Sequence, residues 1–179
     1  MLRAENCGLL VIDIQGKLAK TVAHSKDLIA QTQALILGCK ALEIPVIWLE
    51  QTPDKLGATT PEIAQLLQPG KAITKTTFSG YANSAFVQRL TNENKQHWIL
   101  CGIEAHICVY QTACDLLSQN LGIVLIEDAI SSRNLAHKTL ALTKLQQLGA
   151  QISNVEMCLY ELLRDSQHPK FKTILNLIK

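Results

Sequence analysis

Short apolar runs alternate along this chain of 179 residues with segments whose apolar residues recur every three or four positions. The runs predict strands, and the helical spacing predicts amphipathic helices. We expect strands at residues 7–12, 44–49, 72–75, 98–101, 121–126 and 150–153. We expect helices at residues 25–42, from 61, at 82–90, 107–119, 134–148 and 154–163, and from 169 onward. This alternation predicts an α/β fold: a six-stranded, largely parallel, doubly wound sheet within three α/β/α layers, forming a single domain over residues 1–179.

The last expected helix begins with Pro169 in its first turn and carries Phe171, Ile174, Leu175 and Ile178 on one stripe. An amphipathic stripe buries itself against some apolar surface, but the pattern does not say which surface. The stripe therefore predicts a helix that either covers the core of the chain or docks on a partner subunit.

Composition narrows the class of protein. Hydrophobic residues make up 47% of the chain and charged residues 18%, as in globular proteins. A formal net charge of +2 without a basic cluster does not favour a nucleic-acid partner, and no apolar run reaches bilayer length. The N-terminus enters the first strand without a signal-peptide region, and the six cysteines include no Cys-x-x-Cys pair. We therefore expect a reduced, cytoplasmic protein with no membrane partner.

Three chemically active residues stand near the carboxyl ends of expected strands. Asp13 ends the first apolar run, Lys75 ends the third, and Cys108 follows the fourth at the start of a helix. In open parallel sheets ligands bind at this edge, and with strand order 3-2-1-4-5-6 the first and fourth strands are neighbours at the switch point. Asp13 and Cys108 should then face one another, while Lys75 must reach across the second strand.

Cys108 is the candidate nucleophile. The free N–H groups and the positive end of the helix dipole at a helix start favour the thiolate, which is the nucleophilic form of cysteine. A cysteine taken alone is more often a small buried core residue, Asp13 could be a simple turn cap, and Lys75 could be a surface lysine. The three together favour chemistry. A carboxylate needs partial burial to raise its pKa before it can serve as a base for a thiol.

The phrases VIDIQ (11–15), KTTFS (75–79) and GIEAHICVYQTA (102–113), with DAISSR (128–133) further on, stand in a fixed order. In these phrases, and in the tail HPKFKTILNLIK, the chain resembles the isochorismatase-like cysteine hydrolases, above all the metal-free "isochorismatase domain-containing" members. Nicotinamidases and carbamoylsarcosine amidases belong to the same group. The resemblance covers nearly the whole chain and implies a Rossmann-like fold. It also implies a catalytic triad of Asp13 as base, Lys75 in support and Cys108 as nucleophile.

The resemblance implies further features of the site. The backbone N–H groups of Glu104 and Cys108 would form an oxyanion hole, beside a cis peptide between Ile103 and Glu104. An acidic residue at position 104 departs from the small residue of nicotinamidases. If its side chain faced the pocket it would disfavour anionic substrates, and otherwise it would pair with a neighbour.

Four residues beside the triad are candidates for binding the substrate, namely Gln15, Phe78, Tyr81 and Tyr110. Phe78 and Tyr81 could equally belong to the core. We expect no catalytic metal, because the five histidines lack ligand spacing and the stretch after the second strand reads Glu50-Gln51-Thr52-Pro53 where nicotinamidases have Asp-x-His. With no GxGxxG or P-loop sequence we also expect no nucleotide cofactor.

The sequence thus predicts a cysteine-dependent, amidase-like hydrolase that cleaves a C–N bond of a small molecule through a Cys108 thioester. The substrate is not specified. Similar proteins form homo-oligomers, so a dimer or larger assembly is expected. The alternatives are a catalytically idle, oligomeric scaffold or binding protein of the same fold and a thiol redox protein, the latter disfavoured by the missing Cys-x-x-Cys.

Overall fold

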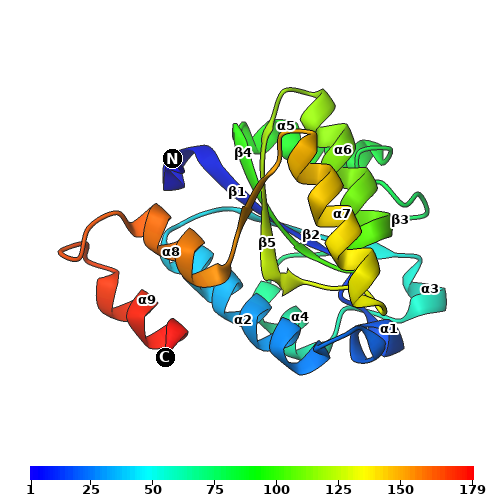
Figure 1. The fold of residues 1–179 in the computed structure, drawn as a ribbon, viewed down its shortest axis with the longest axis horizontal. Helices are drawn as coiled ribbons and strands as arrows, with labels where there is room; N and C mark the ends of the chain where they lie inside the picture. The colour runs from blue at the N-terminus through cyan, green and yellow to red at the C-terminus, as the bar shows by residue number, and fades with distance from the viewer.

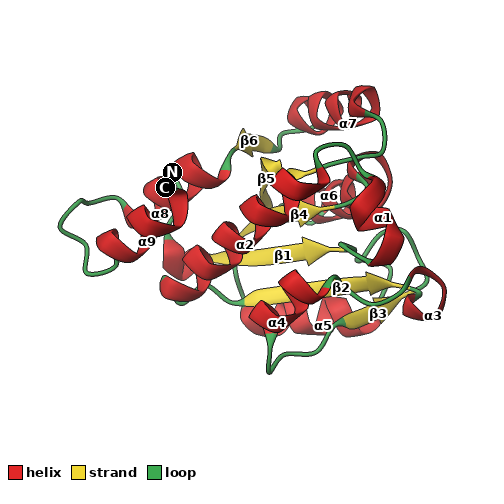
Figure 2. Cartoon of the chain, turned by 90° about the horizontal axis from the view of Figure 1, so that it is seen from below, coloured by secondary structure: helices red, strands yellow, loops and turns green.

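The apolar runs form one sheet of six parallel strands in the order β3-β2-β1-β4-β5-β6 (Figures 1 and 2). The computed structural model describes residues 1–179. The strands are β1 (Cys7–Ile12), β2 (Val46–Gln51), β3 (Ile73–Lys75), β4 (His97–Gly102), β5 (Gly122–Ile130) and β6 (Gln151–Ser153). The predicted α/β class and the predicted strand order are confirmed.

Helices cover both faces of the sheet, as Figure 2 shows. One face buries apolar side chains of α1 (Gly16–Thr21), α2 (Ser25–Ala41), α4 (Pro61–Leu67), α8 (Val155–Leu163) and α9 (Phe171–Ile178). The other face buries those of α5 (Ser84–Glu93), α6 (Tyr110–Ser118) and α7 (Leu135–Gln147). The two clusters lie on opposite sides of the strands because successive strand residues point to opposite faces. No helix in the structure combines the length and the apolar character needed to span a bilayer.

The structure adds elements that the hydrophobic pattern did not indicate. Short helices α1 and α3 (Pro53–Leu56) lie where no helix or strand was expected, and a 3₁₀ turn η1 (Ala4–Asn6) precedes β1. The cysteine helix begins earlier than expected, as a π-helical turn η2 (Ala105–Val109). Strand β5 continues to Ile130, beyond the expected end at 126, because an irregularity in its register with β4 lets Ile130 pair with Gly102.

Helix α9 covers the core of its own chain. Ile174 is fully buried, and Phe171 and Ile178 pack against the same cluster as α2 and α8. Figure 1 shows this helix beside α2 at the C-terminal end of the chain. Of the two interpretations that the stripe left open, the structure shows the intramolecular one, and Phe171, Leu175 and Ile178 keep part of their surface exposed.

Gly102 lets the chain turn from β4 toward the cysteine helix. Its φ is +140°, and a Cβ built there would lie 2.2 Å from the Ile12 carbonyl oxygen in neighbouring β1. Only glycine accepts such a close approach of backbones together with a positive φ. This turn fixes where the chain leaves the sheet on its way to Cys108.

Gly102→Ala should therefore lower the free energy of unfolding by about 3 kcal/mol or more, since a backbone clash adds to an unfavourable φ. Gly149→Ala is the matched control, because Gly149 also has a positive φ (+103°) but nothing lies within 4 Å of a Cβ there. Its loss should be about 1–2 kcal/mol. Urea unfolding of both variants measures the difference, and equal losses would show that the contact with Ile12 is unimportant.

Candidate active site

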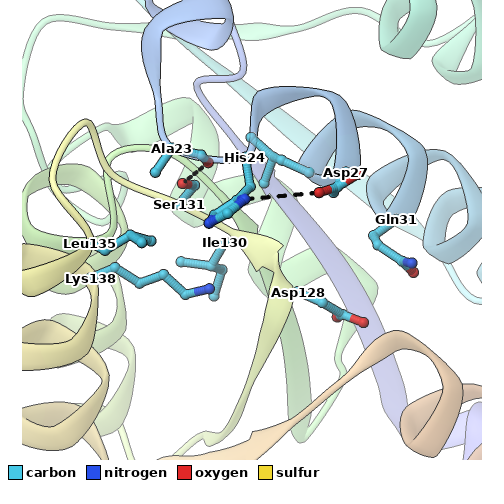
Figure 3. A pocket seen from close by; sticks show the side chains of 10 residues that line it. Ala23, His24, Asp27, Gln31, Asp128, Ile130, Ser131, Leu135 and Lys138 are labelled. Carbon is cyan, nitrogen blue, oxygen red and sulfur yellow. Dashed lines mark hydrogen bonds and ion pairs between the residues drawn. The ribbon is translucent and has the colours of Figure 1, made fainter.

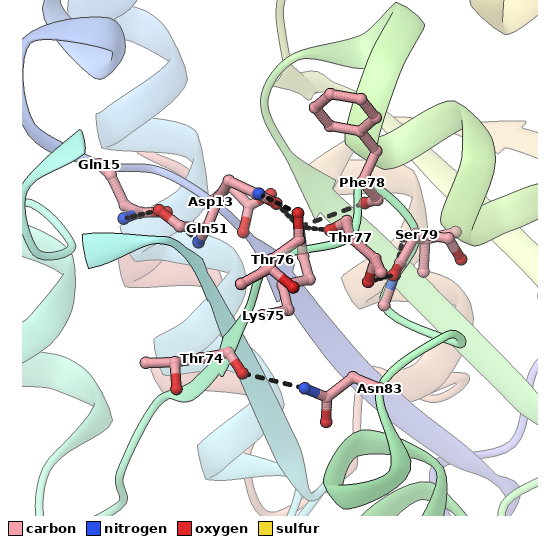
Figure 4. A network of polar contacts seen from close by, with 12 residues as sticks. Asp13, Gln15, Gln51, Thr74, Lys75, Thr76, Thr77, Phe78, Ser79 and Asn83 are labelled. Carbon is pink, nitrogen blue, oxygen red and sulfur yellow. Dashed lines mark hydrogen bonds and ion pairs between the residues drawn. The ribbon is translucent and has the colours of Figure 1, made fainter. Parts of the chain in front are cut away.

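The strand order brings three polar strand ends together at the carboxyl edge of the sheet. Asp13 follows β1, Gln51 ends the adjacent β2, and Lys75 ends β3, where it stands opposite Gln51 in the strand register. On the other side of β1, strand β4 leads through Gly102 to Cys108 in η2. Figure 4 shows Asp13, Gln51 and Lys75 converging.

Lys75 reaches across the end of β2 to Asp13. Its Nζ donates to Asp13 Oδ2 at 2.7 Å and to Gln51 Oε1 at 2.7 Å. The carbonyl oxygens of Thr77 and Phe78 lie at 3.3 and 3.2 Å from the same nitrogen. The Lys75 side chain is fully buried and that of Asp13 is 3% exposed. All three ammonium hydrogens are therefore used within the protein, so Lys75 acts as a fixed charge.

Gln51 is a member of this site that the sequence interpretation missed. Its Nε2 donates to the Thr76 carbonyl at 2.8 Å, which turns its Oε1 toward Lys75. Its backbone N–H donates to Gln15 Oε1 at 2.6 Å. The signal was present, because Gln51 is polar and ends an apolar strand, as Asp13 and Lys75 do.

Burial governs the charges of the reacting groups. It raises the pKa of Asp13, although Lys75 opposes this rise. Burial also raises the pKa of Cys108 to about 12, the negative charge of Asp13 adds to the rise, and Lys75 opposes it. Both effects oppose the thiolate that the helix start favours, since Cys108 is only 7% exposed and lies beside an anion. They favour a protonated thiol in the resting site.

The Asp13 carboxylate keeps one oxygen free. Its Oδ2 is bound by Lys75, whereas the buried Oδ1 has no hydrogen-bond partner in the protein. The Cys108 thiol lies beside this carboxylate, and the interaction between the two side chains acts to lower the pKa of Asp13 and to raise that of Cys108. An unpaired buried acceptor next to a protonated thiol is suited to receive its proton.

The turn before Cys108 presents a free donor. The peptide between Ile103 and Glu104 is cis, as the resemblance implies. The backbone N–H of Glu104 donates to no carbonyl or side chain of the protein. The neighbouring Ala105 N–H, by contrast, donates to the Ser131 carbonyl at 2.9 Å. The Glu104 N–H is thus available for a ligand oxygen.

The Glu104 side chain pairs with neighbours. Arg133 Nε donates to Glu104 Oε1, and His106 Nε2 lies 3.3 Å from Oε2, too poorly aligned for a hydrogen bond. His106 Nδ1 lies 2.9 Å from Ser132 Oγ. Burial lowers the pKa of His106, although Glu104 opposes this, so Arg133 is the main counter-charge of Glu104.

The four predicted substrate-binding residues take different places. The fully buried Gln15 uses its amide within the protein, with Gln51 and the Gly57 carbonyl. Phe78 is 54% exposed, and its ring points away from Lys75 in Figure 4. Tyr81 and Tyr110 are partly buried and pack against the core under α5, α6 and α7.

Three cavities lie near this edge of the sheet. One of about 460 Å³ lies at the end of β3 and is lined by Lys75, Thr52, Thr74, Thr76 and Asn83 among others, but not by Asp13 or Cys108. A second, of about 210 Å³, lies between Tyr110, His106, His137 and Lys144. A third, of about 240 Å³, lies among His24, Asp27, Asp128 and Lys138 on the α2 side (Figure 3). Only the first contains a residue of the predicted triad.

No set of three or more His, Cys, Asp or Glu side chains is arranged to hold a metal ion. Glu50 and Gln51 stand where nicotinamidases begin their ligand set, and both are engaged elsewhere. Glu50 Oε1 accepts from the backbone and the hydroxyl of Thr59, each at 2.7 Å, while Gln51 contacts Lys75. These two residues do not fit a metal site.

Comparisons with known proteins identify relatives of this chain and structures with the same fold. The family model described as "Isochorismatase domain" matches residues 7–157. "Isochorismatase domain-containing protein 2" of Danio rerio is 37% identical over 171 residues, which are 95% of this chain and 85% of that protein. A solved structure described as the MAR1 ribonuclease of Caenorhabditis elegans is 35% identical, with a TM-score of 0.93 over 99% of this chain and 91% of its own. YcaC of Escherichia coli, described as an octameric hydrolase of unknown specificity, shares the fold at 20% identity, with a TM-score of 0.89 over 98% of this chain and 94% of its own.

The electrostatics of the site predict an unusual response to Asp13→Asn. Removing the negative charge should lower the pKa of Cys108 and accelerate its alkylation by iodoacetamide at pH 8. For each unit by which the pKa of Cys108 falls, about ten times more of the thiol is ionised, but the thiolate becomes a weaker nucleophile. The alkylation rate should therefore rise about threefold per unit. Site-resolved mass spectrometry measures the rate, and the wild-type rate should keep rising toward pH 10.

Asp128→Asn is the matched control, since Asp128 is a half-buried acid whose pKa burial raises but which does not act on Cys108. It should leave the Cys108 rate unchanged. Slower alkylation in Asp13→Asn would mean that Asp13 generates the resting thiolate after all.

Proposed function

Because this chain belongs to the isochorismatase domain family, we propose that it is a hydrolase that cleaves a C–N bond of a small, neutral amide-type molecule through Cys108. The observation that carries the proposal is the buried Lys75–Asp13 pair at the switch point, with one Asp13 oxygen unpartnered beside a protonated thiol. A buried ion pair with an unpaired carboxylate oxygen is not needed to stabilise a fold, so we assign it a catalytic role.

In the proposed reaction, Cys108 Sγ attacks the carbonyl carbon of the substrate as its proton passes to Asp13 Oδ1. The backbone N–H groups of Glu104 and Cys108 hold the developing oxyanion. Collapse of this intermediate breaks the C–N bond, and Asp13 returns the proton to the leaving nitrogen. Asp13 then takes a proton from water, whose oxygen attacks the thioester, and the departing Cys108 sulfur receives that proton. The raised pKa of Asp13 suits both directions of transfer.

The charges support a neutral substrate. Lys75 is fully engaged within the protein, and Arg133 is paired with Glu104. Neither cation is therefore available to form an ion pair with a carboxylate of the substrate. The buried Glu104 lies next to the proposed oxyanion hole and would repel an anion bound there.

A second candidate comes from the relative described as a ribonuclease, at 35% identity. The net charge of +2 is too small to argue for RNA as the substrate. The catalytically idle scaffold remains the alternative from another class.

All six cysteines are free thiols, which supports our expectation of a reducing, cytoplasmic setting.

A panel of small amides tests the reaction, with Cys108→Ala as the control and RNA included. We expect turnover of at least one neutral amide, lost by a factor of at least about 10³ in Cys108→Ala, because nothing replaces the nucleophile. Carboxylated analogues of the same amide should have a lower kcat/KM. Equal turnover by Cys108→Ala would refute the mechanism, and turnover of RNA alone would favour the ribonuclease.

We also propose a homo-oligomer in solution, as for the relative described as octameric. A surface suited to the interface is that of α7, which carries exposed Leu135 and Leu140, with exposed Leu148 at its C-cap. Light scattering at micromolar concentration should give at least a dimer mass. Leu140→Lys should lower that mass if α7 forms the interface, and a monomeric wild type would refute the proposal.

A further inference from the structure

The segment that follows β3 is tied to the helix that follows Cys108. Gly80 N–H donates to Thr112 Oγ1 at 2.9 Å, and Ser79 Oγ donates to Asp115 Oδ2. Cys108 lies in η2, and Thr112 and Asp115, four and seven positions later, lie in α6, which follows η2 directly. The helical stretch η2–α6 that carries the thiol therefore also holds this segment.

Ser79 is the centre of the tie. Its hydroxyl donates to Asp115 and accepts from Tyr81 N–H at 3.2 Å, and its carbonyl accepts from Thr77 Oγ1 at 2.7 Å. Ser79 is itself buried. The carbonyl groups of the two residues just before it, Thr77 and Phe78, are the ones that face Lys75 Nζ. Figure 4 shows Ser79 beside the residues that surround Lys75.

We propose that Ser79 and Asp115 are positioning residues that set the place of the Lys75 ammonium relative to the Cys108 sulfur. Neither touches the reacting atoms. Asp115 holds Ser79 by a charge-assisted hydrogen bond, which is stronger than a neutral one. Ser79 in turn holds the two carbonyl groups against Lys75. The helical stretch η2–α6 thus fixes the position of the Cys108 sulfur. Through Asp115 and Ser79 it also fixes the position of the Lys75 ammonium, which favours the Cys108 thiolate.

The link predicts an effect on Cys108 that travels through Lys75. Releasing the carbonyl groups loosens Lys75 and weakens the attraction that favours the Cys108 thiolate. Asp115 is not among the charges that act on Cys108 directly. It does act directly on the partly exposed Cys114, where burial raises the pKa of the thiol and the charge of Asp115 adds to the rise.

Two variants separate the indirect effect from the direct one, with the alkylation rates of Cys108 and Cys114 measured by mass spectrometry between pH 8 and 10. Ser79→Ala should slow Cys108 about threefold and leave Cys114 unchanged. Asp115→Ala should slow Cys108 by a similar factor and accelerate Cys114, because it also removes a charge. The double variant should slow Cys108 no further than either single change, since both break one link.

Ser118→Ala is the matched control, because its hydroxyl bonds only to the Cys114 carbonyl within α6. It should leave the Cys108 rate unchanged. If Asp115→Ala does not fold, Thr112→Val breaks the neighbouring tie to Gly80 and should also slow Cys108. Unchanged Cys108 rates in folded Ser79→Ala and Thr112→Val would overturn the proposal.

This inference rests on the proposed function only in treating Cys108 as the nucleophile. Alkylation does not require turnover, so the two can fail separately. Turnover by Cys108→Ala would refute the hydrolase mechanism, while the alkylation rates would still decide whether Ser79 and Asp115 position Lys75.

Discussion

The buried ion pair between Lys75 and Asp13 is the constraint on which the rest of the site depends. Each charge loses its water when it is buried, at a cost of several kcal/mol that the mutual attraction repays only with good geometry and further hydrogen bonds. The chain meets this condition with a 2.7 Å contact and with acceptors from Gln51, Thr77 and Phe78. Removing one partner would leave the other charge buried without a counter-ion.

The need to satisfy this pair explains the arrangement of the strand ends. Asp13 and Lys75 belong to strands separated by β2, and the gap is filled by Gln51, whose amide is oriented by Thr76 and whose backbone is held by Gln15. Gln15 therefore serves the site through Gln51. A sheet in which β2 ended one residue earlier would place no acceptor between the two charges.

The sequence was sufficient to predict the sheet, since strands and helices alternate clearly in the hydrophobic pattern and parallel strands then follow a familiar order. It also pointed to Asp13 and Lys75, which the structure joins, and to Cys108 near them, because each stands near the carboxyl end of a strand. Their catalytic roles stay a prediction. It did not reveal α1 or α3, whose short segments carry little periodicity. Nor did it reveal Gln51, because an uncharged glutamine indicates a functional site only once it is known to lie between Asp13 and Lys75.

The protonation state of Cys108 was beyond the sequence for a different reason. The helix start favours a thiolate locally, but burial and the nearby Asp13 anion act in the opposite direction and prevail. Both effects depend on tertiary packing, which brings residues 13 and 108 together. Local rules therefore describe only the helix start, whereas the pKa of the thiol also depends on residues that the fold brings beside it.

The protonated thiol has a consequence for how the proposed reaction would be catalysed. In the resting site the charges of Lys75 and Asp13 compensate each other, Glu104 is paired with Arg133, and the sulfur is neutral. The new negative charge would then form on the substrate oxygen, where the unpaired Glu104 N–H is available. An interaction that strengthens only as that charge develops lowers the barrier without tightening the binding of the substrate. A pre-formed thiolate would instead place the charge beside Asp13 before any substrate had bound, where the repulsion would have to be overcome in every resting molecule.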